Sequence, residues 1–252
     1  MPAIEYLGID VGGTGVKMGI VHADTGQINN FQSYDTATWR ESNHFLDRLA
    51  DAIALHLYQH KNVQKVGIRL PGILTKDRRT LIEITAIPEI DGSPMIDMLE
   101  KRFPEHTFFM ENDANAAALG EMLFGSAKGM QNFILLTLGT GLGSGLVLNG
   151  KIVSGSNGLA AEYGHSLLVK NGRLCNCGQQ GCFETYVSAT GLKRTALSLM
   201  ARSNKYSLLR EIAPNDLDAL KIAEAGEAGD ELAKKAIEKT KTRTFNKLRY
   251  LT

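Results

Sequence analysis

The stretch YLGIDVGGTGVKMGIV, residues 6–21, predicts a β-strand, a glycine-rich turn and a second β-strand. The stretch FILLTLGTGLGSGLVL, residues 133–148, repeats this pattern roughly 130 residues later, and it is the only internal repeat that we find. Two matched hairpins suggest two related lobes. We place the N-terminal lobe at residues 1–113 and the C-terminal lobe at residues 114–252, each with its own glycine hairpin.

The segments around these hairpins alternate between strand and helix patterns. The helix expected over residues 41–60 places Phe45, Leu49 and Ile53 on one apolar stripe. The other expected elements are strands at Lys65–Leu70 and Thr107–Met110, helices at Pro94–Arg102 and Ala114–Phe124, and a mostly helical region from Ser188 onward. This alternation indicates the α/β class.

The overall composition gives no electrostatic reason to propose a nucleic acid or an anionic membrane as a partner. The 252 residues include 28 Lys and Arg against 27 Asp and Glu. No signal peptide is visible in residues 1–10, and no run reaches the roughly 18 apolar residues of a membrane span. We therefore expect a cytoplasmic protein.

The two glycine-rich turns are candidate phosphate sites. Glycines let the backbone approach a ligand closely, and free N–H groups of such a turn can surround an anion. The hydroxyls of Thr14 and Thr140 add donors, and Asp10 precedes the first turn, where a carboxylate can hold Mg²⁺. Neither turn has the P-loop or dinucleotide spacing. The alternative is that both are ordinary glycine hairpins.

An acidic segment, ENDAN at residues 111–115, lies between an expected strand and an expected helix. One interpretation is that Asp113 only caps the helix. The other is that Asp113 is a general base that accepts the proton of a substrate hydroxyl during phosphoryl transfer, a reaction that otherwise needs positioning and charge neutralisation. The amide of Asn112 would then hold a neighbouring hydroxyl.

All three cysteines lie close together in the segment CNCGQQGC, residues 175–182. Such an odd, clustered set is a poor disulfide framework and a better metal site. The glycines of the segment let the loop fold back so that Cys175, Cys177 and Cys182 converge, and His165 is the preferred fourth ligand. We expect a closed, structural zinc site, with three free buried thiols as the alternative.

Jointly these motifs resemble the ROK family of sugar kinases and repressors. The matching segments are IDVGGTGVK (9–17), ENDANAAA (111–118), GTGLGSG (139–145), AEYGH (161–165) and CNCGQQGCFE (175–184). The resemblance runs from about Leu7 to Gly191 and more weakly to about Lys239. It implies an actin-like ATPase fold of the ribonuclease H-like type, with two lobes and with sugar and ATP in the interlobe cleft.

The resemblance also implies the role of each matching residue. Asp113 would be the base, and one ring nitrogen of His165 would bind zinc while the other contacts the sugar. The implied sugar ligands are Gly72, Asn112, Glu162, His165 and Glu184. The residues implied for the phosphates and Mg²⁺ are Asp10, Gly12, Gly13, Thr14, Lys17, Gly139, Thr140 and Gly141.

The implied activity is an ATP-dependent phosphorylation of a hexose, with glucose ahead of N-acetylated hexosamines or mannose and the 6-hydroxyl as acceptor. ATP, Mg²⁺ and Zn²⁺ are the expected cofactors, and a homodimer is the expected assembly. The family's repressors begin with a DNA-binding helix-turn-helix. This chain begins with the first hairpin, so we expect no nucleic acid partner.

Two departures from the family pattern bear on this interpretation. Ala86 stands where family members usually carry an asparagine that touches the sugar. Residues 241–252 show no resemblance, and the expected segment that contacts adenosine does not follow. We therefore expect a truncated, frameshifted or naturally short chain that binds ATP poorly. The alternative function is an inactive, sugar-binding or regulatory relative.

Overall fold

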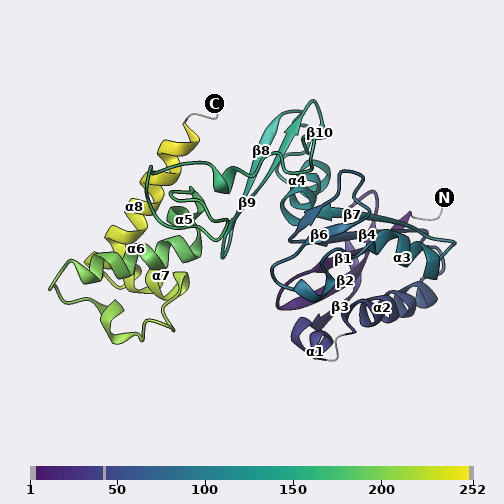
Figure 1. Cartoon of the computed structure of the whole chain (residues 1–252), viewed down its shortest axis with the longest axis horizontal. Coiled ribbons are helices and arrows are strands. Elements are labelled where there is room, and N and C mark those ends of the chain that lie inside the picture. The colour runs from purple at the N-terminus through teal and green to yellow at the C-terminus, as the bar shows by residue number, and fades with distance from the viewer. Residues whose placement is uncertain (1–3, 42–43, 250–252) are drawn as a thin grey trace. The chain divides into compact units, whose positions relative to one another are not determined.

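The computed structural model describes residues 4–41 and 44–249 and divides into two compact units. Unit 1 comprises Met1–Leu135 and Gly145–Ala161, and unit 2 comprises Leu136–Ser144 and Glu162–Thr252. In Figure 1 the first unit runs from purple to teal, and the green and yellow helices belong to the second. The expected lobe boundary at residues 113 and 114 lies inside unit 1 and stays a prediction.

Unit 1 is built on a five-stranded sheet in the order β3-β2-β1-β4-β7. Its strands are β1 (Glu5–Val11), β2 (Gly15–His22), β3 (Ile28–Asp35), β4 (Lys65–Leu70) and β7 (Thr107–Asn112). The first three strands form an antiparallel meander, whereas β1, β4 and β7 run parallel. Parallel strands end at the same edge of a sheet, so the last residues of these three strands lie side by side.

The helices of unit 1 carry the expected apolar stripes with one correction. These helices are α1 (Thr36–Arg40), α2 (Phe45–Gln59), α3 (Met95–Arg102) and α4 (Asp113–Phe124). The single helix expected over residues 41–60 is wrong at its start, because Asp35 caps a separate α1 that ends at Arg40. Residues 42 and 43 lie outside the described residues. The stripe itself is confirmed, since Phe45, Leu49 and Ile53 are buried.

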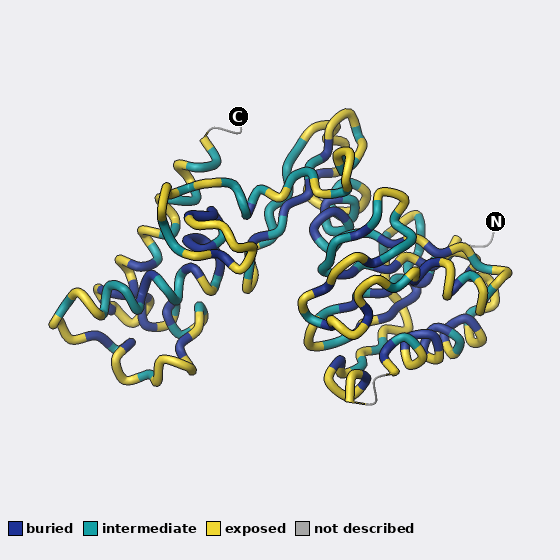
Figure 2. The backbone as a smooth tube through the Cα atoms, in the orientation of Figure 1, coloured by how far each residue is buried: buried dark blue, intermediate teal, exposed yellow. Residues whose placement is uncertain are grey.

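The main hydrophobic core of unit 1 lies against the sheet. Alternate side chains of β1 and β2, such as Leu7, Ile9 and Met18, are buried together with the α2 stripe. Figure 2 shows this alternation of buried and exposed backbone along the strands and helices. Two small strands, β5 (Ile73–Leu74) and β6 (Leu81–Glu83), and the 3-10 turn η1 (Pro88–Ile90) complete the unit between β4 and α3.

The second glycine hairpin is also present. It forms a three-stranded sheet in the order β10-β9-β8, with β8 at Phe133–Leu138, β9 at Leu142–Leu148 and β10 at Lys151–Ile152. The turn and the strand residues next to it, Leu136–Ser144, belong to unit 2. The rest of β8 and β9, and all of β10, belong to unit 1. The prediction of two strand–turn–strand hairpins is therefore confirmed.

Unit 2 is mainly helical, as the sequence predicts for the region after Ser188. Its elements are η2 (Tyr163–His165), α5 (Glu184–Val187), α6 (Ala189–Ala201), η3 (Leu208–Glu211), α7 (Ala219–Glu227) and α8 (Glu231–Leu248). Helix α8 packs against α5, α6 and α7, and small residues such as Ala196, Ala233 and Ala236 allow the close approach. Within the part of the chain that the structure describes, no helix is long and apolar enough to cross a bilayer.

Candidate functional site

The junction of β7 and α4 shows which residue caps the helix. The N-cap is Asn112, whose side-chain oxygen accepts hydrogen bonds from the backbone N–H groups of Ala114 (3.0 Å) and Asn115 (3.4 Å). Asp113 is the first helical residue, and its Oδ1 accepts the N–H of Ala114 at 2.8 Å. The alternative in which Asp113 is the N-cap is therefore wrong. The side chain of Asp113 keeps 31% of its surface exposed.

Arg69 joins the two carboxylates that the sequence singles out in unit 1. Its Nη1 lies 2.9 Å from Oδ2 of Asp10, and its Nη2 lies 3.6 Å from Oδ2 of Asp113. This arrangement follows from the register, because Asp10 on β1 and Arg69 on β4 are paired across the parallel strands. All three side chains keep between 31% and 42% of their surface exposed, so a ligand can reach them.

Sequence reasoning missed Arg69. The only signal was a cation directly before Leu70 and the Pro71-Gly72 pair, at the end of an expected strand. The partners of Arg69 come from strands that are distant in sequence. A buried Nε atom of Arg69 has no hydrogen-bond partner within the described ranges. The guanidinium is thus held mainly through its two terminal nitrogens.

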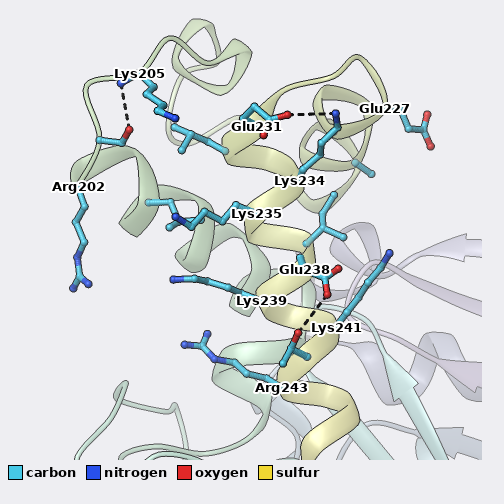
Figure 3. Close-up of a pocket in the computed structure, with 17 residues that line it drawn as sticks. Arg202, Lys205, Glu227, Glu231, Lys234, Lys235, Glu238, Lys239, Lys241 and Arg243 are labelled. Atoms are coloured by element: carbon cyan, nitrogen blue, oxygen red, sulfur yellow. Dashed lines mark hydrogen bonds and ion pairs between the residues drawn. The ribbon is translucent and has the colours of Figure 1, made fainter.

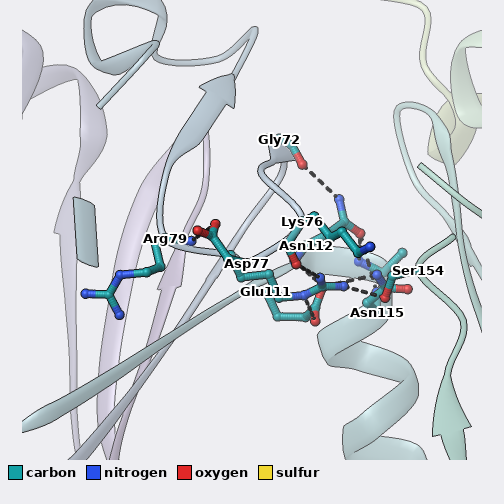
Figure 4. Close-up of polar contacts among 10 residues, drawn as sticks. Gly72, Lys76, Asp77, Arg79, Glu111, Asn112, Asn115 and Ser154 are labelled. Carbon is teal, nitrogen blue, oxygen red and sulfur yellow. Dashed lines mark hydrogen bonds and ion pairs between the residues drawn. The ribbon is translucent and has the colours of Figure 1, made fainter. Parts of the chain in front are cut away.

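Asn112 also binds the predicted sugar-pocket residue Gly72. Its Nδ2 donates to the carbonyl oxygen of Gly72 at 3.3 Å, as Figure 4 shows. An asparagine amide has two N–H donors and one oxygen. The oxygen of Asn112 already accepts two helix N–H groups, so its second N–H is the donor that remains for a ligand.

A second network, centred on Arg78, supports this junction from the loop between β5 and β6. Its Nε donates to Glu111 at 2.5 Å, and its Nη2 donates to Ser154 at 2.5 Å. The other oxygen of Glu111 accepts from the backbone N–H of Asn112 at 3.0 Å and from Nδ2 of Asn115 at 3.1 Å. Figure 4 shows these contacts converging on Glu111. Arg78 therefore positions the residue that precedes Asn112.

Arg78 has a left-handed backbone, with φ of 56°. A non-glycine residue in this region is uncommon and needs support from its surroundings. Here the support comes from the ion pair with Glu111, which is mostly buried on both sides. Sequence reasoning also missed this residue, because a Lys-Asp-Arg-Arg loop is most simply interpreted as a solvated turn.

The first glycine turn is held by hydrogen bonds at Gly12, whereas its tip is exposed to solvent. The N–H of Gly12 donates to the carbonyl oxygen of Gly15 at 3.0 Å, and the buried Thr36 hydroxyl donates to the Gly12 carbonyl oxygen at 2.7 Å. Gly13, Thr14 and Lys17 are exposed. A Cβ on Gly13 would lie 3.0 Å from Cβ of Ala86, so Ala86 packs directly against this turn.

The second glycine turn contacts a predicted sugar ligand of unit 2. The N–H of Leu142 donates to Oε2 of Glu184 at 2.7 Å, and a Cβ on Gly141 would lie 2.5 Å from the same oxygen. Only glycine lets the carboxylate come this close. The carbonyl oxygen of Gly139 accepts from the N–H of Ala189 at 2.9 Å, so the start of α6 holds the turn. Thr140 stays exposed.

The cysteine segment folds as predicted, and its four potential ligand atoms lie within 4.8 Å of one another. The sulfurs of Cys177 and Cys182 are 3.6 Å apart, and the sulfur of Cys175 is 3.6 Å from Nδ1 of His165. In a tetrahedral site with Zn–S bonds of about 2.3 Å, neighbouring ligands lie about 3.5–3.8 Å apart. The donor set and its spacing therefore fit zinc. Because Nδ1 of His165 faces the thiols, Nε2 is its remaining ring nitrogen.

Without a bound cation, the surroundings of the cluster keep two of its three thiols protonated. Burial, followed by hydrogen bonds from the other thiols, raises the pKa of the Cys182 thiol to about 12. Burial also raises the pKa of Cys175. For Cys177, burial acts to raise the pKa, but the backbone N–H of Gln179 and the two neighbouring thiols outweigh it, and the pKa is lowered. Cys175 and Cys182 are buried and Cys177 is exposed, and a metal bound to the three sulfurs would stabilise their thiolates.

The predicted site residues thus fall into two groups that the structure describes separately. Unit 1 brings Asp10 and Asp113 together through Arg69, and Asn112 onto Gly72. Unit 2 brings Glu184 onto the second turn and within 3.8 Å of the sulfur of Cys175. Glu162 begins the short η2 turn, and its carbonyl oxygen accepts the N–H of His165 at 3.0 Å.

Comparison with known proteins identifies the family. The sequence profile of the ROK family matches residues 6–247. The chain belongs to the ROK family. The match extends beyond Lys239, so the prediction that the resemblance ends there is wrong. ROK kinases have the actin-like ATPase fold, which confirms the predicted fold class and the assignment to ROK sugar kinases.

Three relatives illustrate this similarity. The glucokinase of Thermotoga maritima is 35% identical over 237 residues, which cover 92% of the ROK chain and 73% of the relative. The N-acetyl-D-glucosamine kinase of Pectobacterium carotovorum is 33% identical over 75% of the chain and 64% of the relative. The ROK glucokinase of Streptomyces griseus, solved with glucose and AMPPNP, is 33% identical with a TM-score of 0.78, covering 98% and 78% of the two chains.

Proposed function

We propose that this ROK chain transfers the γ-phosphoryl group of ATP to the 6-hydroxyl of a hexose, with Asp113 as general base. The observation that carries the proposal is that two neighbouring residues at the start of α4 have different roles. Asn112 caps the helix, which leaves Asp113 beside the guanidinium of Arg69 with an accessible carboxylate. The relatives that are named as glucokinase and as N-acetylglucosamine kinase support this class of reaction.

In the proposed reaction, the sugar hydroxyl oxygen attacks the γ-phosphorus while its proton passes to the carboxylate of Asp113. The bond between the γ-phosphorus and the bridging oxygen breaks, and ADP leaves with that oxygen. The free N–H of Asn112 would donate to a neighbouring sugar hydroxyl. The network from Arg78 through Glu111 fixes the backbone at Asn112, so the base keeps its position during the transfer.

The two glycine turns are proposed to bind the phosphates. The Gly13–Thr14 and Thr140–Gly141 segments offer backbone N–H groups and the hydroxyls of the two threonines. The N–H of Gly139 already donates to the carbonyl oxygen of Gly141 at 3.0 Å, so Gly139 would serve the turn's shape. Asp10 would hold Mg²⁺ directly or through water. Arg69, which sits between Asp10 and Asp113, adds a positive charge where negative charge develops on the transferred group.

The proposed zinc site has a structural role. Zn²⁺ bound by His165, Cys175, Cys177 and Cys182 would have no open coordination position for water. It would instead fix the loop that carries His165 and Glu184. Both residues are assigned to the sugar, and the carboxylate of Glu184 already lies against the Cys175 sulfur and the second turn.

Glucose is the proposed substrate, ahead of N-acetylated hexosamines and mannose. The glucokinase relatives support this order. Ala86 lacks a polar side chain and packs against Gly13. One sugar contact that family members make is therefore absent, and we expect a weaker preference among hexoses.

The test measures ATP-dependent phosphorylation of glucose, mannose, N-acetylglucosamine and N-acetylmannosamine by the 252-residue chain, with the product position assigned by NMR. We expect turnover with glucose and a phosphate on O6. Phosphorylation at O1 would contradict the position. Thermal stabilisation by sugar without any turnover would contradict the kinase function and identify a sugar-binding relative instead.

A further inference from the structure

A second basic site lies in unit 2 among residues that the proposed reaction does not use. A cavity of about 430 Å³ is lined by Gly172, Arg173, Tyr186, Thr195, Ser198, Leu199, Arg202, Lys239 and Arg243. Four of these residues are cations, and none carries a carboxylate. Of the three hydroxyls in the lining, that of Thr195 already donates to the carbonyl oxygen of Gly191 at 2.9 Å, and those of Ser198 and Tyr186 can donate a hydrogen bond to a ligand. The lining therefore suits an anion.

Helix α8 supplies part of this charge as a stripe. Lys235, Lys239 and Arg243 are spaced by four residues, so they share one face of the helix. Figure 3 shows all three extended on the same side of α8, with Arg202 of α6 on that side too, whereas Lys241 extends from the opposite side. Like charges at this spacing destabilise a helix unless a counter-charge is present.

Tyr186 and Arg173 form a rigid wall of the cavity. The guanidinium carbons of Arg173 and Arg243 each lie 4.6 Å from the centre of the Tyr186 ring, so two cations flank one aromatic ring. Arg173 is fixed by hydrogen bonds to the carbonyl oxygens of Thr185 (2.7 Å) and Gly191 (2.9 Å) and to Oγ1 of Thr195 (2.9 Å). None of these partners neutralises its charge.

Arg243 provides an independent sign of a missing partner. Its Nη1 is buried and has no hydrogen-bond partner within residues 4–41 and 44–249. A buried donor without a partner costs free energy, and such groups in native proteins need an explanation. Among the same described residues, Arg202, Lys239 and Arg243 form no ion pair with a carboxylate. An oxyanion in the cavity would satisfy both requirements.

We infer that this cavity binds the phosphoryl group of a small molecule. Guanidinium groups match the oxygen geometry of phosphate with paired N–H donors, and a phosphate dianion suits three cations without counter-charges. Lys239 would act as a flexible point charge at the rim, since its side chain is exposed. Arg202, Lys239 and Arg243 also line a larger groove beside α8, of about 1390 Å³, which leaves room for the organic part of a phosphate ester. The groove, unlike the cavity, also carries carboxylates, those of Glu227, Glu231 and Glu238.

Free inorganic phosphate and a phosphate ester share this chemistry, and the experiment separates them. Inorganic phosphate and glucose 6-phosphate are titrated calorimetrically into the intact chain and into the variants Arg243→Gln and Lys239→Gln. The matched control is Lys221→Gln on α7, which removes the same charge from unit 2 outside both the cavity and the groove. Thermal melting shows that each variant is folded.

We expect binding of at least one of the two anions, and a loss of affinity of about 10-fold or more in Arg243→Gln, as for a hydrogen bond to a charged group. Lys239→Gln should lose affinity too, and Lys221→Gln should stay within about twofold, because a charge outside both the cavity and the groove is screened. Tighter binding of glucose 6-phosphate than of phosphate would identify an ester as the ligand, and the reverse order would identify the free oxyanion. No binding of either anion, or an equal loss in the Lys221→Gln control, would overturn the inference.

Discussion

The candidate site residues of the two units are held in place in different ways. In unit 1, the predicted carboxylates of Asp10 and Asp113 both contact Arg69, and the neighbouring Glu111 contacts Arg78. In the thiol cluster of unit 2, the side-chain partners of the ligand atoms are one another and Glu184. No cation of the protein takes part in that cluster within the described residues.

This difference shows what each group of residues requires to keep its shape. The unit 1 group is cross-linked by ion pairs between its own side chains, so it needs no ligand to bring them together. The unit 2 group brings three thiols and an imidazole into contact, at a cost that a bound metal would remove. We therefore expect the two groups to respond differently to metal removal and to substitutions.

The largest expected effect is the loss of the proposed zinc ion. The isolated chain should hold about one Zn²⁺, and Cys182→Ser or a strong chelator should lower the unfolding free energy of unit 2 by roughly 5 kcal/mol or more, because structural zinc binding is worth about 10–16 kcal/mol in small domains. Elemental analysis and helical circular dichroism measure both effects.

Trp39 makes the comparison direct, because it is the only tryptophan and it lies buried in unit 1. Its fluorescence transition should stay unchanged while the helical signal of unit 2 is lost. Asn176→Ser, in the same loop but outside the ligand set, is the matched control. Metal-free protein as isolated, or a Trp39 transition that moves together with the helical signal, would refute the proposed difference.

The next effect is catalytic. Asp113→Asn should lower kcat by roughly 10²–10⁴-fold, the usual contribution of a general base. Glucose affinity and melting temperature should hardly change, since Asn112 and not Asp113 caps α4. Steady-state kinetics with ATP and glucose, together with sugar titration, provide the measurement. A variant that keeps nearly normal kcat would exclude Asp113 as the base.

Substitution of Arg69 should have a somewhat smaller effect on catalysis than substitution of Asp113. Two different substitutions separate the contribution of its charge from that of its paired N–H donors. Arg69→Gln is expected to lower kcat/KM for ATP by about 10²-fold, the loss that follows removal of one charge-stabilising group. Arg69→Lys should recover only part of it, because lysine keeps the charge without the paired donors. The KM for glucose is the internal control. Equal losses for ATP and glucose would indicate a purely structural role.

Arg78 should have the smallest effect of the four. Arg78→Met leaves Glu111 without its ion-pair partner, and we expect about 1–3 kcal/mol of destabilisation, the cost of an unsatisfied half-buried group. Denaturant unfolding of Arg78→Met, Glu111→Gln and the double variant forms a cycle that measures the coupling. Additive single effects would show that the ion pair does not support the site.

Much of the fold follows from local sequence patterns. Glycine turns between alternating apolar residues specify both hairpins, because each needs only neighbouring residues to form. The strand bounds at Lys65–Leu70 are predicted correctly for the same reason. The start of the helix expected over residues 41–60 is wrong because Glu41 is the C-cap of the separate α1, whereas α2 begins at Phe45 after His44, whose side chain makes no capping hydrogen bond.

The candidate site residues also divide into those that a local sequence pattern predicts and those that it does not. The cysteine cluster lies in eight consecutive residues plus one histidine, so its convergence is predictable from spacing alone. Arg69 and Arg78 act on carboxylates that are 33 or more residues away in the chain, as the contact between Arg78 and Glu111 shows. Their roles depend on parallel strand pairing and on a left-handed loop residue, which no local pattern encodes.

The path of the chain between the two units has an evolutionary consequence. Unit 1 is completed only by Gly145–Ala161, which returns after the second glycine turn has been contributed to unit 2. Ser154, on this returning segment, supports Arg78. A single genetic crossover between ROK genes therefore cannot exchange one unit intact. Residues on both sides of the second hairpin must be inherited together, and recombinant genes that separate them should be counter-selected.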